Sequence, residues 1–293
     1  MFNADYREIR QWLVEQIRAG QPAEALLRSM RDRGWNRDVA MGLIAQAMSI
    51  RAGADGAAPA AAAPAAATPV ALPRRAEMPR PIVSEGAMRV DLGDRQVTVM
   101  AALDAPEVMQ FDGFLSDAEC DALIDLALPR MQRSLTVDIE TGESRKDLVR
   151  TSRGMFFTRG ETPLVRTIEA RVARLLAWPV EHGEHLQVLH YRPGDRYEPH
   201  YDYFDPTGPG AQAVLARGGQ RIATFLMYLR EPERGGDTTF PDLGLRFAAK
   251  RGTALFFAYD RPDPSSRTLH GGAPVIAGEK WVATKWLRES VFE

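Results

Sequence analysis

The sequence predicts a protein of two parts, in which the larger part is an α+β domain with a closed or sandwiched antiparallel β core. Three observations support this fold class. Residues 5–50 carry apolar side chains at helical spacing, and residues 52–73 are rich in alanine and proline. From residue 88 onward, strand-like stretches and two helices precede seven or more short β segments separated by Gly, Pro and Asp, a pattern typical of α+β domains.

The N-terminal unit, residues 1–51, is predicted to be a small set of helices. A first apolar helical pattern ends at Gly20, Pro22 suits the first turn of a second helix that Gly34 closes, and Asn36 can cap a third. Acidic and basic residues nearly balance in this unit. The balance favours a packing or partner-docking role over DNA binding.

Residues 52–87 are predicted to be a linker. Its first part, "AGADGAAPAAAAPAAATPVALP" at 52–73, contains one acidic residue and no basic one. Proline every few residues breaks the helix that alanine would favour, so we expect an extended, mobile segment. Order is expected to resume near residue 88.

The domain at 88–293 opens with the strand-like stretches "MRVDLG", "RQVTVMAAL" and "EVMQFDGF". In "SDAECDALIDLAL" that follows, Ser116 and Glu119 form the Ser-x-x-Glu capping box of a helix, and Cys120 lies on its apolar face as a small packed residue. A second helix is predicted to begin at Thr162–Pro163. The β segments after it are "HLQVLHY", "RIATFLMYL", "TTFP", "LRFAAK", "GTALFFAY", "GGAPVIAG" and "KWVATKWL".

The composition argues against several classes of function. The formal net charge of -2 argues against broad attraction to nucleic acid or anionic membrane. No apolar run approaches the roughly 20 residues of a membrane helix, and the N-terminus lacks a signal-peptide pattern. A single cysteine allows no internal disulfide, so we expect a protein of the reducing cytoplasm.

The stretch "YEPHYDYF" at 197–204 places His200 and Asp202 two residues apart. On a strand their side chains share one face, whereas on a helix they would point to nearly opposite sides. Imidazole and carboxylate suit Fe(II), and a two-histidine, one-carboxylate facial triad needs one more histidine. The alternative is a half-buried strand with a satisfied polar pair. The histidines that compete for the third position are His182, His185, His190 and His270.

Lys280 adds a second signal. Only four of the 37 basic residues are lysines, so a lysine is more informative here than usual. Lys280 follows His270 by ten residues, and in the strand "KWVATKWL" it shares a face with Val282, Thr284 and Trp286. If that is the core face, the ammonium is buried and needs an anion, which a bound ligand would supply.

Together, His200-x-Asp202, the distant His270 and Lys280 resemble the iron(II)- and 2-oxoglutarate-dependent dioxygenases, and more narrowly their prolyl 4-hydroxylase group. The matching stretches are "VRTSRGMFF", "HYRPGDRYEPHYDYF", "GGQRIATFLMYLREPERGGDTTFP", "KRGTALFFAY" and "TLHGGAPVIAGEKWVATKWLRE". The resemblance covers roughly residues 107–290 and nothing in residues 1–75. It implies a double-stranded β-helix, or jelly roll, with flanking helices.

The resemblance also implies a role for each matching position. His200, Asp202 and His270 would hold Fe(II), and Lys280 would bind the far carboxylate of 2-oxoglutarate. The residues that would line the cosubstrate pocket are Tyr191, Tyr197, Thr224 and Trp286. Those that would lie near the substrate entrance are Arg150 and Ser152. Taken alone, the tyrosines are better explained as strand aromatics and Arg150 as a solvated surface charge, and only the joint pattern favours the functional roles.

The implied activity is hydroxylation of a peptidyl residue, with proline expected, using Fe(II), 2-oxoglutarate and O2 and releasing succinate and CO2. Dependence on ascorbate and formation of a homodimer stay open. Polar residues 139–153, "IETGESRKDLVRTSR", are expected to form a mobile flap over an extended peptide substrate rather than a strand. The alternatives are hydroxylation of a free amino acid or small molecule, and a non-catalytic binding module on the same fold.

Overall fold

The structure is a computed structural model that describes residues 9, 12–32, 40–44, 47–48, 78–133, 135–137, 144–146, 151–208 and 210–293. The chain divides into two compact units, Met1–Pro73 and Arg74–Glu293. The first unit is helical over residues 12–18, α2 (Ala23–Asp32) and residues 40–44, and it buries Leu13, Ile17 and Met30. Gly34 and Asn36, the predicted helix end and cap, lie outside the described residues.

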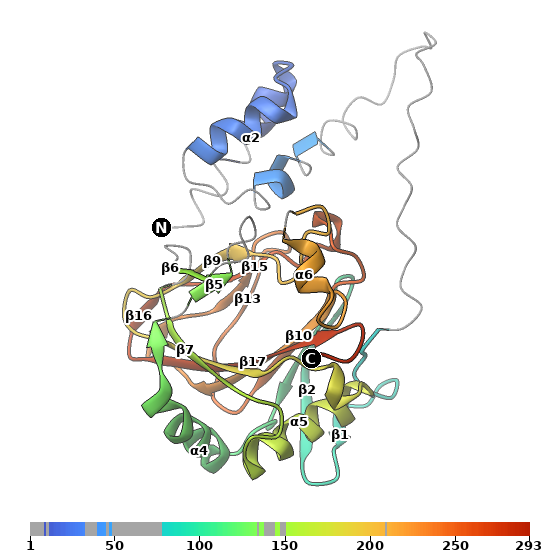
Figure 1. The fold of residues 1–293 in the computed structure, drawn as a ribbon, viewed down its shortest axis with the longest axis vertical. Coiled ribbons are helices and arrows are strands. Elements are labelled where there is room, and N and C mark those ends of the chain that lie inside the picture. Colours follow the sequence, from blue (N-terminus) through green and yellow to red (C-terminus); the bar gives the residue numbers. More distant parts are fainter. Residues whose placement is uncertain are drawn as a thin grey trace. The chain divides into compact units, whose positions relative to one another are not determined.

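The second unit is built on two antiparallel sheets (Figure 1). Among the described residues, the large sheet has nine strands in the order β1-β2-β3-β14-β10-β17-β8-β7-β4, and the small sheet has four in the order β13-β12-β15-β9. The strands of the large sheet are β1 (Arg89–Asp91), β2 (Gln96–Asp104), β3 (Glu107–Asp112), β14 (Ala254–Ala258), β10 (Arg221–Arg230), β17 (Lys280–Arg288), β8 (Leu186–Tyr191), β7 (Arg153–Phe157) and β4 (Gln132–Arg133). Those of the small sheet are β13 (Leu245–Phe247), β12 (Thr238–Phe240), β15 (His270–Gly272) and β9 (Tyr197–His200).

In the part of this unit that the structure describes, there are two further strand pairs and three helices. The pairs are β5 (Leu135–Val137) with β6 (Ser144–Lys146), and β11 (Arg234–Gly235) with β16 (Val275–Ala277). The helices are α4 (Asp117–Ala127), α5 (Pro163–Leu176) and α6 (Ala211–Leu215), with 3-10 turns at Leu128–Arg130, Val180–His182 and Pro264–Ser266. Figure 1 shows α4 and α5 on the face of the large sheet that is turned away from the small sheet. The predicted jelly roll with flanking helices is confirmed.

The two predicted helices begin where their caps place them. Ser116 caps α4, and its capping box with Glu119 is formed in both directions. Thr162 caps α5, and Pro163 occupies its first turn. Cys120 is fully buried on the inner face of α4, and burial raises the pKa of its thiol to about 11, which makes it chemically inert.

Strand alternation separates two apolar cores. On β10, Phe225 and Met227 pack toward the helices, whereas Tyr228 points into the space between the sheets. On β17, Trp281 faces the helices and Val282 faces the space between the sheets. This period of two makes the large sheet the wall shared by both cores. Among the described residues, no helix combines the length and the apolar character needed to cross a membrane.

Order in the second unit begins earlier than the sequence predicts. The Arg80 and Ile82 amides donate to the carbonyls of Leu176 and Leu175, at 3.1 Å and 2.8 Å, and Val83 packs against the core. The last carbonyls of a helix lack partners within it, and this segment supplies them at the end of α5. Residues 80–83, which were predicted to belong to the linker at 52–87, therefore pack on the second unit.

The segment predicted to be an irregular flap also contains a strand. Ser144–Lys146 forms β6, which pairs with Leu135–Val137 of β5. The polar composition argued against a strand, but pairing with β5 satisfies the backbone regardless of side-chain polarity. Residues 138–143 and 147–150 lie outside the described part of the chain, so a flap over the substrate stays a prediction.

A buried ion pair joins helix α5 to the large sheet. Lys285 of β17 lies 2.5 Å from Glu169 of α5, and each side chain is only a few per cent exposed. The second Glu169 oxygen accepts from the Gly160 amide at 2.8 Å. A buried charge that loses its partner is far more costly than a neutral pair in the same place.

We expect Glu169→Gln to lower the free energy of unfolding by about 3 kcal/mol, because it leaves the Lys285 ammonium buried without an anion. Adding Lys285→Met should recover at least half of that loss. The matched control is Asp112→Asn, which breaks the exposed pair with Lys250 (3.0 Å) and should cost under about 1 kcal/mol. Urea unfolding followed by tryptophan fluorescence measures all three. Equal losses for the buried and exposed pairs would contradict the expectation.

Candidate metal centre and adjoining pocket

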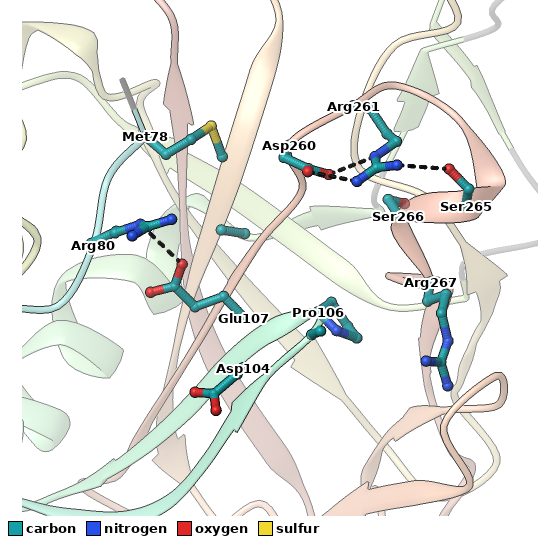
Figure 2. Close-up of a pocket in the computed structure, with 12 residues that line it drawn as sticks. Met78, Arg80, Asp104, Pro106, Glu107, Asp260, Arg261, Ser265, Ser266 and Arg267 are labelled. Carbon is teal, nitrogen blue, oxygen red and sulfur yellow. Dashed lines mark hydrogen bonds and ion pairs between the residues drawn. The ribbon is translucent and has the colours of Figure 1, made fainter. Parts of the chain in front are cut away.

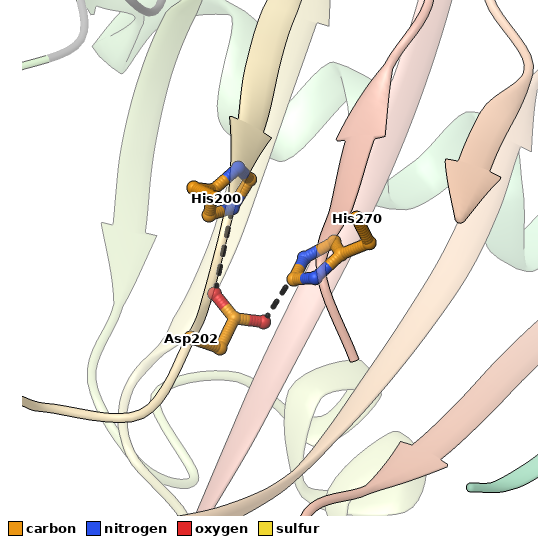
Figure 3. Close-up of side chains that lie close together, drawn as sticks. All are labelled: His200, Asp202 and His270. Atoms are coloured by element: carbon orange, nitrogen blue, oxygen red, sulfur yellow. Dashed lines mark ion pairs between the residues drawn. The ribbon is translucent and has the colours of Figure 1, made fainter. Parts of the chain in front are cut away.

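Three side chains from two strands and a bend converge between the sheets. His200 ends β9 and His270 begins β15, and the two residues face each other in the β9–β15 ladder. The Asp202 carboxylate points toward both rings (Figure 3), with His200 Nε2 3.6 Å from its Oδ1 and His270 Nε2 3.3 Å from its Oδ2. The ligand atoms of all three lie within 4.8 Å of one another.

The prediction that His200 and Asp202 share one face of a strand is wrong. Strand β9 ends at His200, and Asp202 sits in a bend beyond it, so the two side chains do not share a strand face. Asp202 is instead held by its surroundings. Thr224 donates to its Oδ2 at 2.6 Å, and Arg221 donates to its backbone carbonyl at 3.4 Å. Both partners come from β10 of the opposite sheet.

The hydrogen bonds of the two imidazoles fix the nitrogen that each offers. His200 Nδ1 lies 2.9 Å from the Glu198 carbonyl, and His270 Nδ1 lies 3.0 Å from the Thr268 carbonyl. A carbonyl only accepts, so Nδ1 carries the hydrogen on both rings and the Nε2 lone pairs are free for a metal. A backbone partner of this kind is usual behind a metal-binding histidine.

The electrostatics also fit a cation. Burial opposes ionisation of Asp202, but the neighbouring His270 and His200 outweigh burial and hold the pKa of the carboxyl well below its usual range. Burial and the nearby His270 lower the pKa of His200, which favours the neutral imidazole that a metal requires. Two neutral imidazoles and one carboxylate form the donor set of a facial triad, which suits Fe(II).

The other three histidines lie elsewhere. His190 stacks on Trp281 at 4.1 Å and reaches the Glu279 carboxylate at 3.1 Å. His182 packs edge-on against Trp178, and His185 against Phe292. His270 therefore takes the third position that the sequence left open.

A pocket runs from the metal trio to Lys280. Tyr191, Tyr197, Thr224 and Trp286 line it, as the resemblance implied, together with Thr238 and Phe257. The Tyr197 ring stacks on His200 at 3.7 Å, and Phe257 lies 4.5 Å from the ring of His270. Aromatic rings against both imidazoles restrict the access of water to the metal trio.

Lys280 is buried at the other end of this pocket. Its Nζ donates to the Gly236 carbonyl at 2.6 Å and lies 5.4 Å from the ring of Tyr191. No ion pair joins it to any carboxylate that the structure describes. Burial lowers the pKa of Lys280 to about 8, against the opposing influence of Asp237. An ammonium in this state favours an anionic ligand.

The structure describes one of the two residues that were predicted to lie near the substrate entrance. Ser152 is fully buried and is not part of the pocket lining, so its side chain is not available to a substrate there. Ser152 comes directly before β7, and the amide of the preceding residue, Thr151, donates to the Arg196 carbonyl at 3.3 Å. Arg150 lies outside the described residues.

Several residues of the site were missed in the sequence. Tyr228 donates to Thr238 at 2.8 Å and lies 5.8 Å from the Lys280 ammonium. Strand parity would have found Tyr228, because it shares a face of β10 with Thr224. Gly236 carries no such signal, because its carbonyl reaches Lys280 through a tertiary contact from a loop.

A second cavity of about 210 Å³ lies apart from the metal trio. Figure 2 shows that two of the arginines that line it pair with carboxylates: Arg80 with Glu107 at 3.6 Å, and Arg261 with Asp260 at 2.7 Å. None of the trio lines this cavity. Arg267 also lines this cavity but is exposed to solvent, whereas the Lys280 ammonium is buried, so the pocket with Lys280 is the better candidate for an anionic ligand.

Comparison with known proteins agrees with the site. The model of the 2OG-Fe(II) oxygenase superfamily matches residues 186–288. Among similar proteins, the probable prolyl 4-hydroxylase 3 of Arabidopsis thaliana is 43% identical over 203 residues, which cover 62% of this chain and 69% of the relative. The probable prolyl 4-hydroxylase 10 of the same plant is 45% identical over 206 residues, which cover 62% of this chain and 69% of that relative.

Solved structures include a viral collagen prolyl hydroxylase from Paramecium Bursaria Chlorella virus-1 in a 2OG complex. It is 32% identical, with a TM-score of 0.48, and the match covers 62% of this chain and 95% of that one. A Pseudomonas putida prolyl-4-hydroxylase is 18% identical, with a TM-score of 0.42. That match covers 62% of this chain and 92% of the other.

We expect Asp202→Ala to lower the affinity for Fe(II) or Co(II) by more than about 100-fold, because it removes a ligand rather than a partner behind one. His270→Ala should do the same. His185→Gln serves as the matched histidine control and should bind metal like the unaltered protein. Anaerobic calorimetric titration measures the affinities. Tight binding by Asp202→Ala would show that the trio is not the metal site.

Proposed function

The chain belongs to the 2OG-Fe(II) oxygenase superfamily and, within it, to the prolyl 4-hydroxylase group, and on this premise we propose that it hydroxylates a prolyl residue of a peptide or protein. The reaction consumes 2-oxoglutarate and O2. It yields succinate, CO2 and the hydroxylated residue, so that one oxygen atom enters succinate and the other enters the substrate. Bound Fe(II) supplies the redox chemistry that activates O2.

The observation that carries this proposal is the composition of one pocket. His200, Asp202 and His270 meet at one end, and the Lys280 ammonium lies buried at the other. The three ligands would hold Fe(II) on one face and leave its other positions to ligands. Lys280 would pair with the distal carboxylate of 2-oxoglutarate, and such a pair is stronger in a water-poor pocket than at a surface.

The protein also orders the remaining parts of the pocket. Trp286 packs against the Arg221 guanidinium, whose carbon lies 3.9 Å from the ring centre, and Glu184 pairs with Arg221 at 2.6 Å. This buried stack fixes one wall of the pocket. Support for a peptide substrate comes from the names of the relatives, which are prolyl 4-hydroxylases.

The direct test incubates the protein with Fe(II), 2-oxoglutarate, O2 and a proline-rich peptide, and measures succinate and peptide mass. We expect one succinate for each gain of one oxygen, and loss of both products in Asp202→Ala. Lys250→Ala, at an exposed lysine, is the control. Succinate formed with free proline but not with peptides would favour a small-molecule hydroxylase. No succinate with any substrate would favour a non-catalytic binding module.

The pKa of Lys280 predicts a pH dependence. The ammonium is the form that binds the dianion, and the free site loses its proton above pH 8. Affinity for 2-oxoglutarate should therefore be level below pH 8 and fall toward about tenfold per pH unit above it. Lys280→Arg keeps its charge and should lack this decline, whereas Lys280→Ala should bind weakly at every pH. Titration calorimetry on metal-loaded protein tests this, and a level wild-type profile would contradict it.

Four further expectations from the sequence stay proposals. They are a cytoplasmic location, use of ascorbate, formation of a homodimer and absence of a nucleic-acid partner. The net charge of -2 supports the last of these.

A further inference from the structure

A chain of oxygen atoms runs from the metal trio into the core between the sheets. Thr224 Oγ1 lies 2.6 Å from Asp202 Oδ2 and 3.1 Å from the Tyr259 hydroxyl. The three residues are 2%, 6% and 2% exposed, respectively. Because these groups are buried, their hydrogen bonds have little competition from bulk water.

The direction of each hydrogen bond follows from the hydrogen count. An ionised carboxylate only accepts, and a threonine hydroxyl has one hydrogen to give. Thr224 therefore donates to Asp202, and Tyr259 must donate to Thr224. Burial and the nearby Asp202 raise the pKa of Tyr259 well above its usual value, so the phenol keeps the hydrogen that it donates.

This chain limits the rotation of the carboxylate. The terminal torsion of an aspartate is broad, so its two oxygens exchange places easily unless a partner holds one of them. Thr224 holds Oδ2, while Oδ1 faces His200. Tyr259 is itself anchored, because its amide donates to the Ile222 carbonyl on β10 at 2.9 Å.

We propose that Tyr259 is a positioning residue of the metal site, which acts through Thr224 to fix the orientation of the Asp202 carboxylate. Among the described residues, the Tyr259 hydroxyl is bonded to Thr224 and to none of the three ligands, and the resemblance gave it no role. The inference rests on the proposed metal site but is independent of the substrate. In a linear chain, each donated hydrogen bond strengthens the next, so the Tyr259 hydroxyl also strengthens the bond from Thr224 to Asp202.

The test is Tyr259→Phe, which removes only the hydroxyl. We expect the affinity for Co(II), measured without 2-oxoglutarate, to fall about tenfold, as is usual for partners behind a metal ligand. The visible absorption spectrum of bound Co(II) should change as well, because the carboxylate is free to turn. Neither readout depends on turnover.

Thr253→Val is the control. It removes another buried hydroxyl, which donates to the Lys250 carbonyl at 2.7 Å and does not line the pocket of the metal trio. Its melting temperature should fall to a similar degree, while Co(II) affinity and spectrum stay unchanged. If metal affinity follows the melting temperature in both variants, the effect of Tyr259 is only structural and the proposal is wrong.

A double-mutant cycle tests the route through Thr224. Thr224→Val should weaken Co(II) binding by itself, and Tyr259→Phe should add nothing in that background. Simple addition of the two effects would overturn the proposed route. Wild-type protein that fails to bind Co(II) would instead reject the metal site and the proposed function. If the wild-type protein binds Co(II) and Tyr259→Phe binds it with the same affinity and the same spectrum, only this inference is rejected.

Discussion

An ionised carboxylate buried between two sheets is the constraint on which the site depends. Asp202 is 6% exposed and carries its charge in a part of the protein where an isolated anion would be unstable. The Thr224 hydroxyl of the large sheet donates to it, and the Nε2 lone pairs of two imidazoles of the small sheet face it, so a bound cation would balance its charge. The jelly roll provides this arrangement because its two sheets present side chains to a common interior.

Strand β17 shows how the fold treats two buried lysines differently. Lys285 faces the helices, where Glu169 neutralises it within the protein. Lys280, five residues earlier, is on the opposite face, where its ammonium donates to the Gly236 carbonyl, lies near the Tyr191 ring and forms no ion pair with a carboxylate among the described residues. The odd spacing along one strand separates them. One lysine therefore joins the layers of the fold, and the other is left for a ligand.

The sequence predicted those features that depend on local or periodic patterns. The capping box at Ser116, the start of α5 at Thr162 and the inward face of β17 all follow from spacing within one element. The strand argument for Asp202 failed because the end of a strand depends on its neighbours, and β15 pairs with β9 only as far as His200. Likewise, the packing of residues 78–83 depends on the free carbonyls of α5, which no local pattern reveals.

Tertiary contacts also decide which loop governs the metal trio. The segment between β14 and β15 contains Tyr259, which is bonded to Thr224, and Thr268, whose carbonyl accepts from His270 Nδ1. The Ser266 and Thr268 hydroxyls are themselves paired at 2.9 Å inside the protein. This one segment therefore orients two of the three ligands, one through a side chain and one through its backbone. Only His200 takes its orientation from its own strand, through the Glu198 carbonyl. The geometry of the metal centre thus depends more on residues 259–268, which no ligand pattern singles out, than on the His-x-Asp stretch that first drew attention to it.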